Sequence, residues 1–132
     1  MAATFSFRVL TPERTVLEGE MEEVILRAEG GDIAFLAGHV QFIAEVEPSV
    51  VRALRPDQRE DRAAVHGGFV EVRGEEVTVL ASVAELPDEI DVARATRSKQ
   101  QAESRLAATA DDTEADAALQ RANARLDLAG RL

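Results

Sequence analysis

The spacing of the apolar residues changes at Pro87, and this change constrains the fold more than any other feature of the chain. Before Pro87, apolar residues alternate with polar ones or form short runs that stop at glycine-rich turns, a pattern typical of β-strands. After Pro87, apolar residues recur every three or four positions, which is typical of amphipathic helices. We therefore predict two domains, residues 1–87 and residues 88–132.

The first domain is predicted to be an antiparallel β-sandwich, or flattened barrel, with about eight to ten short strands in residues 4–84. Phe5, Phe7 and Val9 alternate with polar residues, as in a half-buried strand. Residues 73–76, Arg-Gly-Glu-Glu, separate two apolar runs and predict a hairpin. Residues 55–62 are charged and predict an exposed connection.

The second domain is predicted to be an antiparallel hairpin of two helices, so that the whole chain falls in the α+β class. The first helix is expected over residues 89–108, with Asp88 as its N-cap. The second is expected from Thr113, which forms a capping box with Asp116, to Ala129, with Gly130 as its stop. A connection of four or five residues makes two such helices antiparallel neighbours.

The apolar stripes of the two helices consist largely of alanine. The second helix carries Ala115, Leu119, Ala122, Leu126 and Ala129 at a spacing of four and three residues. The first helix carries a thinner stripe of Val92, Ala95, Ala102 and Leu106, interrupted by Lys99. Alanine buries little area, at roughly 0.8 kcal/mol per methylene-sized group. We therefore expect stable helices whose docking is weak and adjustable.

Composition excludes several classes of function. The net charge is −10, and residues 1–87 hold 16 acidic residues against 8 arginines, which argues against a nucleic-acid binder. Residues 88–132 hold 9 acidic and 7 basic residues, so basic groups are available there for an acidic partner. The absence of cysteine excludes disulfides and thiolate metal sites, and the absence of tryptophan and tyrosine disfavours stacking on sugars or bases.

No targeting or membrane-spanning segment is expected. The N-terminus lacks a basic region followed by an apolar run, so no secretory signal is predicted. The longest apolar run, Ile33–Leu36, is far shorter than the ~20 residues that a spanning helix needs. We expect an intracellular protein that reaches a membrane only through a partner.

Seven phrases occur in the order that one protein family shows. They are Leu10–Arg14, Gly31–Ile33, Leu36–His39, Val65–Val72, Val77–Ala81, Ala84–Glu85 and Glu89–Asp91. Through this ordered set the chain resembles, over its whole length, the epsilon subunit of bacterial F-type ATP synthases. It departs from the family's usual pattern at Ala37 and at Val40-Gln41, where prolines are usual.

The resemblance implies a non-catalytic subunit of the rotor, in the central stalk of a proton-translocating ATP synthase. Residues 1–87 would bind the gamma subunit and the ring of membrane c subunits. Residues 88–132 would form a mobile regulatory arm that inhibits ATP hydrolysis when it contacts the alpha/beta head. The subunit would be a peripheral membrane protein at the cytoplasmic face of the cell membrane. No cofactor is required, and ATP is a candidate regulatory ligand.

The segment Ile90–Ala95 matches the ATP-binding motif of some epsilon subunits. Arg94 would grip a phosphate with its guanidinium, and Asp91 would accept a hydrogen bond from an amine or hydroxyl. Ile90 and Ala95 are further candidates as members of the motif. In ATP-binding relatives the residues matching Glu85, Arg121 and Arg125 also take part, whereas Gln101 stands where a further basic contact is usual. The alternative is structural: Asp91 caps the helix, and Arg94 pairs with Asp88 or Asp91.

Other candidate residues are contacts with partner subunits. The family resemblance implies that Arg97, Lys99 and Arg105 meet an acidic loop of the beta subunits; the alternative is a solvated helix face. It also implies that Asp32 and His39 face the c ring.

Two alternatives to the rotor subunit remain: a freestanding ATP-sensing module and a small β-sandwich hydrolase. A metal or general-base role for His39 and His66 lacks a third ligand at suitable spacing, so no metal site and no catalytic residue is predicted.

Overall fold

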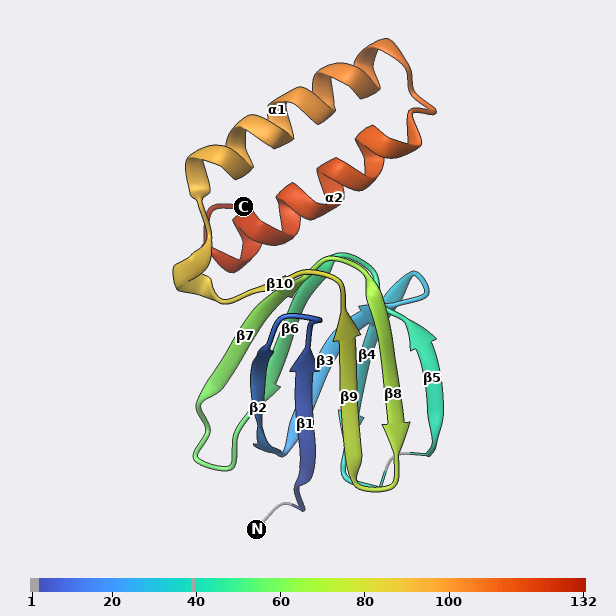
Figure 1. Ribbon diagram of the computed structural model, residues 1–132, viewed down its shortest axis with the longest axis vertical. Helices are drawn as coiled ribbons and strands as arrows, with labels where there is room; N and C mark the ends of the chain where they lie inside the picture. Colours follow the sequence, from blue (N-terminus) through green and yellow to red (C-terminus); the bar gives the residue numbers. More distant parts are fainter. Residues whose placement is uncertain (1–2, 39) are drawn as a thin grey trace.

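The computed structural model describes residues 3–38 and 40–132, and within them it contains ten strands, one turn of 3₁₀ helix and two α-helices (Figure 1). The strands are β1 (Phe5–Leu10), β2 (Thr15–Met21), β3 (Glu23–Ala28), β4 (Gly31–Leu36), β5 (Phe42–Glu45), β6 (Ser49–Leu54), β7 (Glu60–Val65), β8 (Gly68–Arg73), β9 (Glu76–Ala81) and β10 (Ala84–Glu85). The helices are η1 (Pro87–Glu89), α1 (Val92–Ala108) and α2 (Thr113–Leu128). The predicted order of a strand-rich part followed by two helices is confirmed.

The strands form two five-stranded sheets that pack face to face. Sheet A has the order β2-β1-β9-β8-β5, and sheet B has the order β10-β7-β6-β3-β4. The predicted sandwich is therefore confirmed, with one pairing that differs from a purely antiparallel arrangement, because β1 and β9 run parallel. Parallel neighbours need a long crossover, and the intervening strands of both sheets supply it.

The main core lies between the two sheets and is built by the alternation seen in the sequence. Phe5, Phe7 and Val9 point inward from β1 and are buried. Phe7 and Phe35, one from each sheet, are among the largest fully buried side chains. All buried members of this core belong to the strands or to Val46, and Leu86 packs against it from the following linker.

The loops confirm one turn prediction and correct another. Gly74 has a φ of +61° between β8 and β9, where the hairpin was predicted. The expected exposed connection over residues 55–62 is shorter, because β7 begins at Glu60. Arg62 lies directly opposite Arg52 of β6 on the outer face of sheet B, where charged side chains remain hydrated. The charged residues at the end of this segment therefore belong to the exposed face of a strand and not to a loop.

The N-caps of both helices differ from the predicted residues: the cap of α1 lies three residues later, and the cap of α2 lies one residue earlier. Asp91, and not Asp88, caps α1, since its carboxylate accepts from the Arg94 N–H at 3.0 Å. Asp112, and not Thr113, caps α2 by accepting from the Ala115 N–H at 2.9 Å. Residues 87–89 form η1 instead of the first turn of α1. The predicted stop is confirmed by Gly130, whose φ of +72° follows the end of α2.

The helical hairpin lies beyond one end of the sandwich, with α2 between the sandwich and α1 (Figure 1). The buried residues between the helices are mainly small: Ala95 and Ala102 of α1, and Ala115, Ala122 and Leu126 of α2. The alanines at the centre of the predicted stripes are thus buried, whereas the other predicted members are half-buried: Val92, Leu106, Leu119 and Ala129. Among the described residues no helix is both long and apolar enough to cross a membrane.

The contact of α2 with the sandwich was not apparent in the sequence. Ala124 and Leu128 of α2 form a small buried cluster with Ala64 of β7, and Val50 and Ile90 pack at its edge. This cluster is separate from the core between the sheets. The hairpin is therefore held by its own small contact, and the sandwich core does not extend into it.

Candidate functional site

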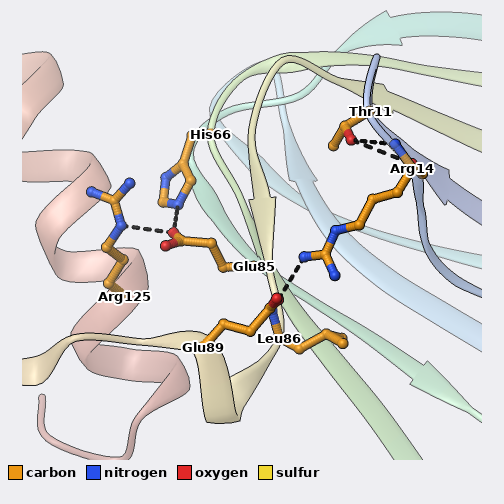
Figure 2. Close-up of polar contacts among 7 residues, drawn as sticks. All are labelled: Thr11, Arg14, His66, Glu85, Leu86, Glu89 and Arg125. Carbon is orange, nitrogen blue, oxygen red and sulfur yellow. Dashed lines mark hydrogen bonds and ion pairs between the residues drawn. The ribbon is translucent and has the colours of Figure 1, made fainter.

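The site is the junction where β10, η1 and the N-terminus of α1 meet the C-terminal half of α2. Glu85 of β10 lies at its centre (Figure 2). Its Oε1 accepts from His66 Nε2 at 2.8 Å and from Arg125 Nε at 2.7 Å. One carboxylate oxygen therefore joins the connection after β7, strand β10 and helix α2.

His66 is the one buried polar or charged side chain of the described residues, with 7% of its surface exposed. Its Nδ1 atom is buried and has no hydrogen-bond partner among residues 3–38 and 40–132. Burial, followed by the positive charge of Arg125, lowers the pKa of His66, although the hydrogen bond to Glu85 partly opposes the shift. The ring is therefore neutral at physiological pH.

A second polar contact ties the linker to the sandwich. Arg14, in the turn between β1 and β2, donates from Nη2 to Glu89 Oε1 at 2.6 Å, and the same oxygen accepts from the Leu86 N–H at 2.8 Å (Figure 2). The hydrogen bond from Arg14, followed by that from Leu86, lowers the pKa of Glu89. Residues 86–89 are thus fastened to the sandwich just before α1 begins.

A small cavity of about 100 Å³ opens between these two contacts. It is lined by Glu85, Glu89, Asp91, Arg94, Ala95, Ser98 and Arg125. Five of the seven residues predicted from the ATP-binding motif therefore lie around one space. The convergence of Arg94 and Arg125 from the two helices follows from the antiparallel hairpin, as the sequence predicted.

Asp91 and Arg94 behave differently from each other. Asp91 caps α1, as the structural alternative predicted. The Arg94 guanidinium, by contrast, forms no ion pair or hydrogen bond with any described residue, so the pairing with Asp88 or Asp91 is not observed. An unpaired guanidinium beside a cavity is suited to bind an anionic group such as a phosphate.

The other two residues of the predicted ATP site do not line the cavity. Ile90 is partly buried and packs against the cluster that holds α2 to the sandwich. Arg121 donates from Nη2 to Glu114 Oε1 at 3.1 Å, on its own helix.

The residues predicted to contact partner subunits lie at the surface. Arg97 is exposed on α1, and Lys99 is partly buried. Arg105 pairs with Asp112, the N-cap of α2, at 2.9 Å, and so closes the turn between the helices. Asp32 of β4 pairs with Arg27 at 3.4 Å. His39 lies outside the described residues.

Two contacts of the junction were missed by sequence reasoning. His66 was weighed only as a metal ligand or base, and Arg14–Glu89 was not considered. The partners are far apart in the chain, and no local pattern links them.

No group of three or more metal-binding side chains is found within the described part of the chain.

The fold and this junction define a class of protein: a β-sandwich with a helical hairpin docked at one end through a charged contact. Comparison with known proteins identifies the family that has this architecture. The models of the ATP synthase delta/epsilon chain match residues 4–87 as its beta-sandwich domain and residues 88–130 as its long alpha-helix domain. The chain belongs to the family of ATP synthase epsilon chains.

The relatives match over nearly the whole chain. The ATP synthase epsilon chain of Bacillus velezensis is 44% identical, covering 96% of this chain and 98% of that protein. That of Bacillus pumilus is 42% identical, covering 97% and 98%. These relatives confirm the resemblance and the expectation of a non-catalytic subunit. They give no support to a freestanding sensor or a small hydrolase.

The fold also occurs in a distant solved structure. A chain of the mitochondrial ATP synthase of Euglena gracilis, from an assembly of OSCP, F1 and c ring, superposes with a TM-score of 0.73 at 17% identity. The match covers 99% of this chain and 80% of that one. At this identity the likeness concerns the fold alone.

Proposed function

We propose that the chain is a rotor subunit of a proton-translocating F-type ATP synthase, which couples gamma to the c ring and regulates ATP hydrolysis through its helical arm. Membership of the epsilon chain family is the observation that carries this proposal. The subunit would be held at the cytoplasmic face of the membrane by its partners. Residues 1–87 would be the coupling domain and residues 88–132 the arm.

The outer face of sheet A offers a surface for gamma. Phe69 and Leu80 lie directly opposite each other on β8 and β9, and each exposes 52% of its surface. Leu10 of β1 lies opposite Leu80 on the other side, so three large apolar side chains form one row across the sheet. Large exposed apolar patches mark protein contacts, and this row would be buried against gamma.

The edge formed by β4 and β5 offers a surface for the c ring. Leu36, Val40 and Ile43 are exposed within eight residues of one another, between or on two edge strands. Asp32 lies on the same β4 strand. Exposed apolar residues with a nearby charge are typical of a protein–protein contact, and this edge would be buried against the c ring.

The arm has the contact expected of a movable element. Its buried cluster on the sandwich consists of three residues, Ala64, Ala124 and Leu128, with two partly buried neighbours. Among the described residues, two ion pairs also link residues 88–132 to the sandwich: Glu85–Arg125 at 2.7 Å, about a quarter exposed, and Arg14–Glu89 at 2.6 Å, more exposed. Two placements of the arm that differ by a few kcal/mol allow a population shift by a ligand or partner.

ATP is proposed as the ligand that favours the docked arm. Arg94 is unpaired, and Arg125 comes from the other helix to the same cavity. A phosphate bound between the two arginines would join α1 to α2, and through Arg125 it would be linked to Glu85 at the junction. The cavity of about 100 Å³ admits a phosphate group, so the rest of a nucleotide would extend along the surface.

Calorimetric titration of the full chain with ATP tests this site. Saturable binding that Arg94→Ala abolishes would support it. Arg97→Ala is the matched control, because it removes an exposed arginine one turn further along α1 that does not line the cavity. Equal binding by wild type and Arg94→Ala, or no heat at all, would reject the site.

Association with gamma tests the coupling surface. Phe69→Ser with Leu80→Ser should weaken capture of the chain by gamma, whereas Leu132→Ser, which removes an apolar side chain that is 68% exposed at the C-terminus, should not. Unchanged capture by the double variant would place the gamma contact elsewhere.

A further inference from the structure

We propose that His66 makes the docking of the arm sensitive to acid: α2 docks against neutral His66, and protonation of His66 releases it. This inference rests on the movable arm proposed above and specifies how the junction is regulated. The observations behind it are the buried position of His66 Nδ1 and the charged side chains that face the His66 ring.

The hydrogen bonding of His66 fixes where an added proton must go. The ionised Glu85 carboxylate can only accept, so His66 Nε2 carries the hydrogen of the 2.8 Å contact. In the neutral ring Nδ1 then holds the lone pair, and a second proton binds there. Nδ1 is buried and has no acceptor among the described residues. Protonation would create a buried donor without a partner, which is unfavourable.

The two arginines near the ring also disfavour its protonation. The titratable and charged groups that face His66 are Glu85 of β10 and Arg125 and Arg121 of α2. Glu85 favours protonation, but its Oε1 is already shared with Arg125. A positive His66 would therefore face two arginines of α2 with one carboxylate between them.

Undocking changes this balance in one direction. Glu85 stays beside His66 in either placement, because β10 pairs with β7 through Glu85↔Ala64 and Ala84↔Val65. The arginines leave with α2, and water gains access to the ring. The undocked chain therefore binds the proton more tightly than the docked chain.

The direction of the pH dependence follows. The pKa of His66 in the docked chain lies below the ordinary value of 6.5. The stabilisation of docking by neutral His66 is fully present at pH values above the ordinary pKa. It is lost as the pH falls through the lowered pKa of His66 in the docked chain. In this window the ratio of docked to undocked chains falls by up to about tenfold per pH unit.

Distance measurements in the full chain test the proposal. The sequence has no cysteine, so two can be introduced as labelling sites without background. Glu75→Cys, in the turn between β8 and β9, and Ala110→Cys, in the turn between α1 and α2, place spin labels on the two parts. Distances are recorded at about pH 7.5 and at about pH 5, on either side of the ordinary histidine pKa.

The expected result is one distance at the higher pH and a second population at the lower pH. His66→Gln keeps an N–H donor for Glu85 but does not titrate, so it should show the docked distance at both values. His39→Gln, which removes the only other histidine of the sequence, should behave as wild type. The same two histidines give separate NMR titrations, in which His66 should titrate below the ordinary value.

Leu128→Glu separates the two possible failures, because it places a charge in the cluster that docks α2. If Leu128→Glu changes the distance but wild type does not respond to pH, His66 is no acid-sensitive element and the movable arm stands. A pH response in His66→Gln equal to that of wild type overturns the inference in the same way. If Leu128→Glu leaves the distance unchanged, the arm is not movable, and both proposals fail.

Discussion

Truncation of Leu128 should release the arm without destabilising the sandwich. Leu128 is 2% exposed and belongs to the small cluster between α2 and sheet B. Leu128→Ala removes three methylene-sized groups, about 2.4 kcal/mol at roughly 0.8 kcal/mol each, and a cavity term adds to this. The docking equilibrium should therefore shift by about 2–3 kcal/mol, or roughly 30–150-fold.

Hydrogen exchange with mass spectrometry measures this shift segment by segment. The amides of α1 and α2 should exchange faster in Leu128→Ala, while those of β1 and β9, two neighbouring strands of sheet A, should keep wild-type rates. Leu126→Ala is the matched control: Leu126 is 4% exposed and belongs to the helical hairpin but not to the docking cluster. It should loosen α1 from α2 without freeing α2 from the sandwich. Equal acceleration of strands and helices in Leu128→Ala would refute a separately docked arm.

Three further predictions concern stability. Gly68→Ala should lower the free energy of unfolding by about 3 kcal/mol or more in urea denaturation, because φ is +131° and a Cβ would collide with the Leu80 carbonyl; Gly74→Ala, at φ +61° in open space, should cost only about 1 kcal/mol. The pKa of Asp112 is lowered, first by the hydrogen bond from the Ala115 N–H, so its contribution to capping α2 is present above its ordinary 3.8 and lost as pH falls through the lowered value; far-UV circular dichroism should show helix loss there, and Asp112→Asn, which still caps α2 but does not titrate, should lack this pH-dependent loss. A fragment of residues 1–87 should fold alone, with dispersed proton NMR signals, because the core between the sheets lies within it; an unfolded fragment would contradict the division at Pro87.

Local sequence patterns predicted the parts of the fold that local forces decide. Alternation in Phe5–Val9 and the Arg-Gly-Glu-Glu turn each follow from a few neighbouring residues, and both are present in the structure. The start of β7 was missed because Glu60 and Arg62 are charged and still sit on the hydrated face of sheet B. Charge distinguishes solvent from core, and it does not by itself distinguish strand from loop.

The helix caps show where local patterns become insufficient. Asp88 and Asp91 are equally good N-caps in sequence, and only one is used. Glu89 is held by Arg14 and by the Leu86 N–H, and this contact draws residues 87–89 into η1 before α1 can begin. Tertiary contacts thus decided between two acceptable local solutions.

The candidate site was partly predictable for the same reason. Asp91, Arg94 and Ala95 lie within one motif, and the antiparallel hairpin brings Arg125 back to them. His66 and Glu85 are separated by 19 residues, and Glu85 and Arg125 by 40. Their meeting depends on the pairing of β10 with β7 and on how α2 docks, which no periodicity in the sequence reveals.

If the arm regulates hydrolysis by leaving the sandwich, locking it in the docked placement should change the rate of hydrolysis. Ala64→Cys with Ala124→Cys places two thiols in the cluster that docks α2, in a chain with no other cysteine. ATP hydrolysis is then measured in ATP synthase assembled with this variant, oxidised and reduced, with each single variant as control. Hydrolysis should be faster when the arm is locked and should return to the slower rate on reduction. Equal rates in a complex whose cross-link is verified would contradict this role of the arm.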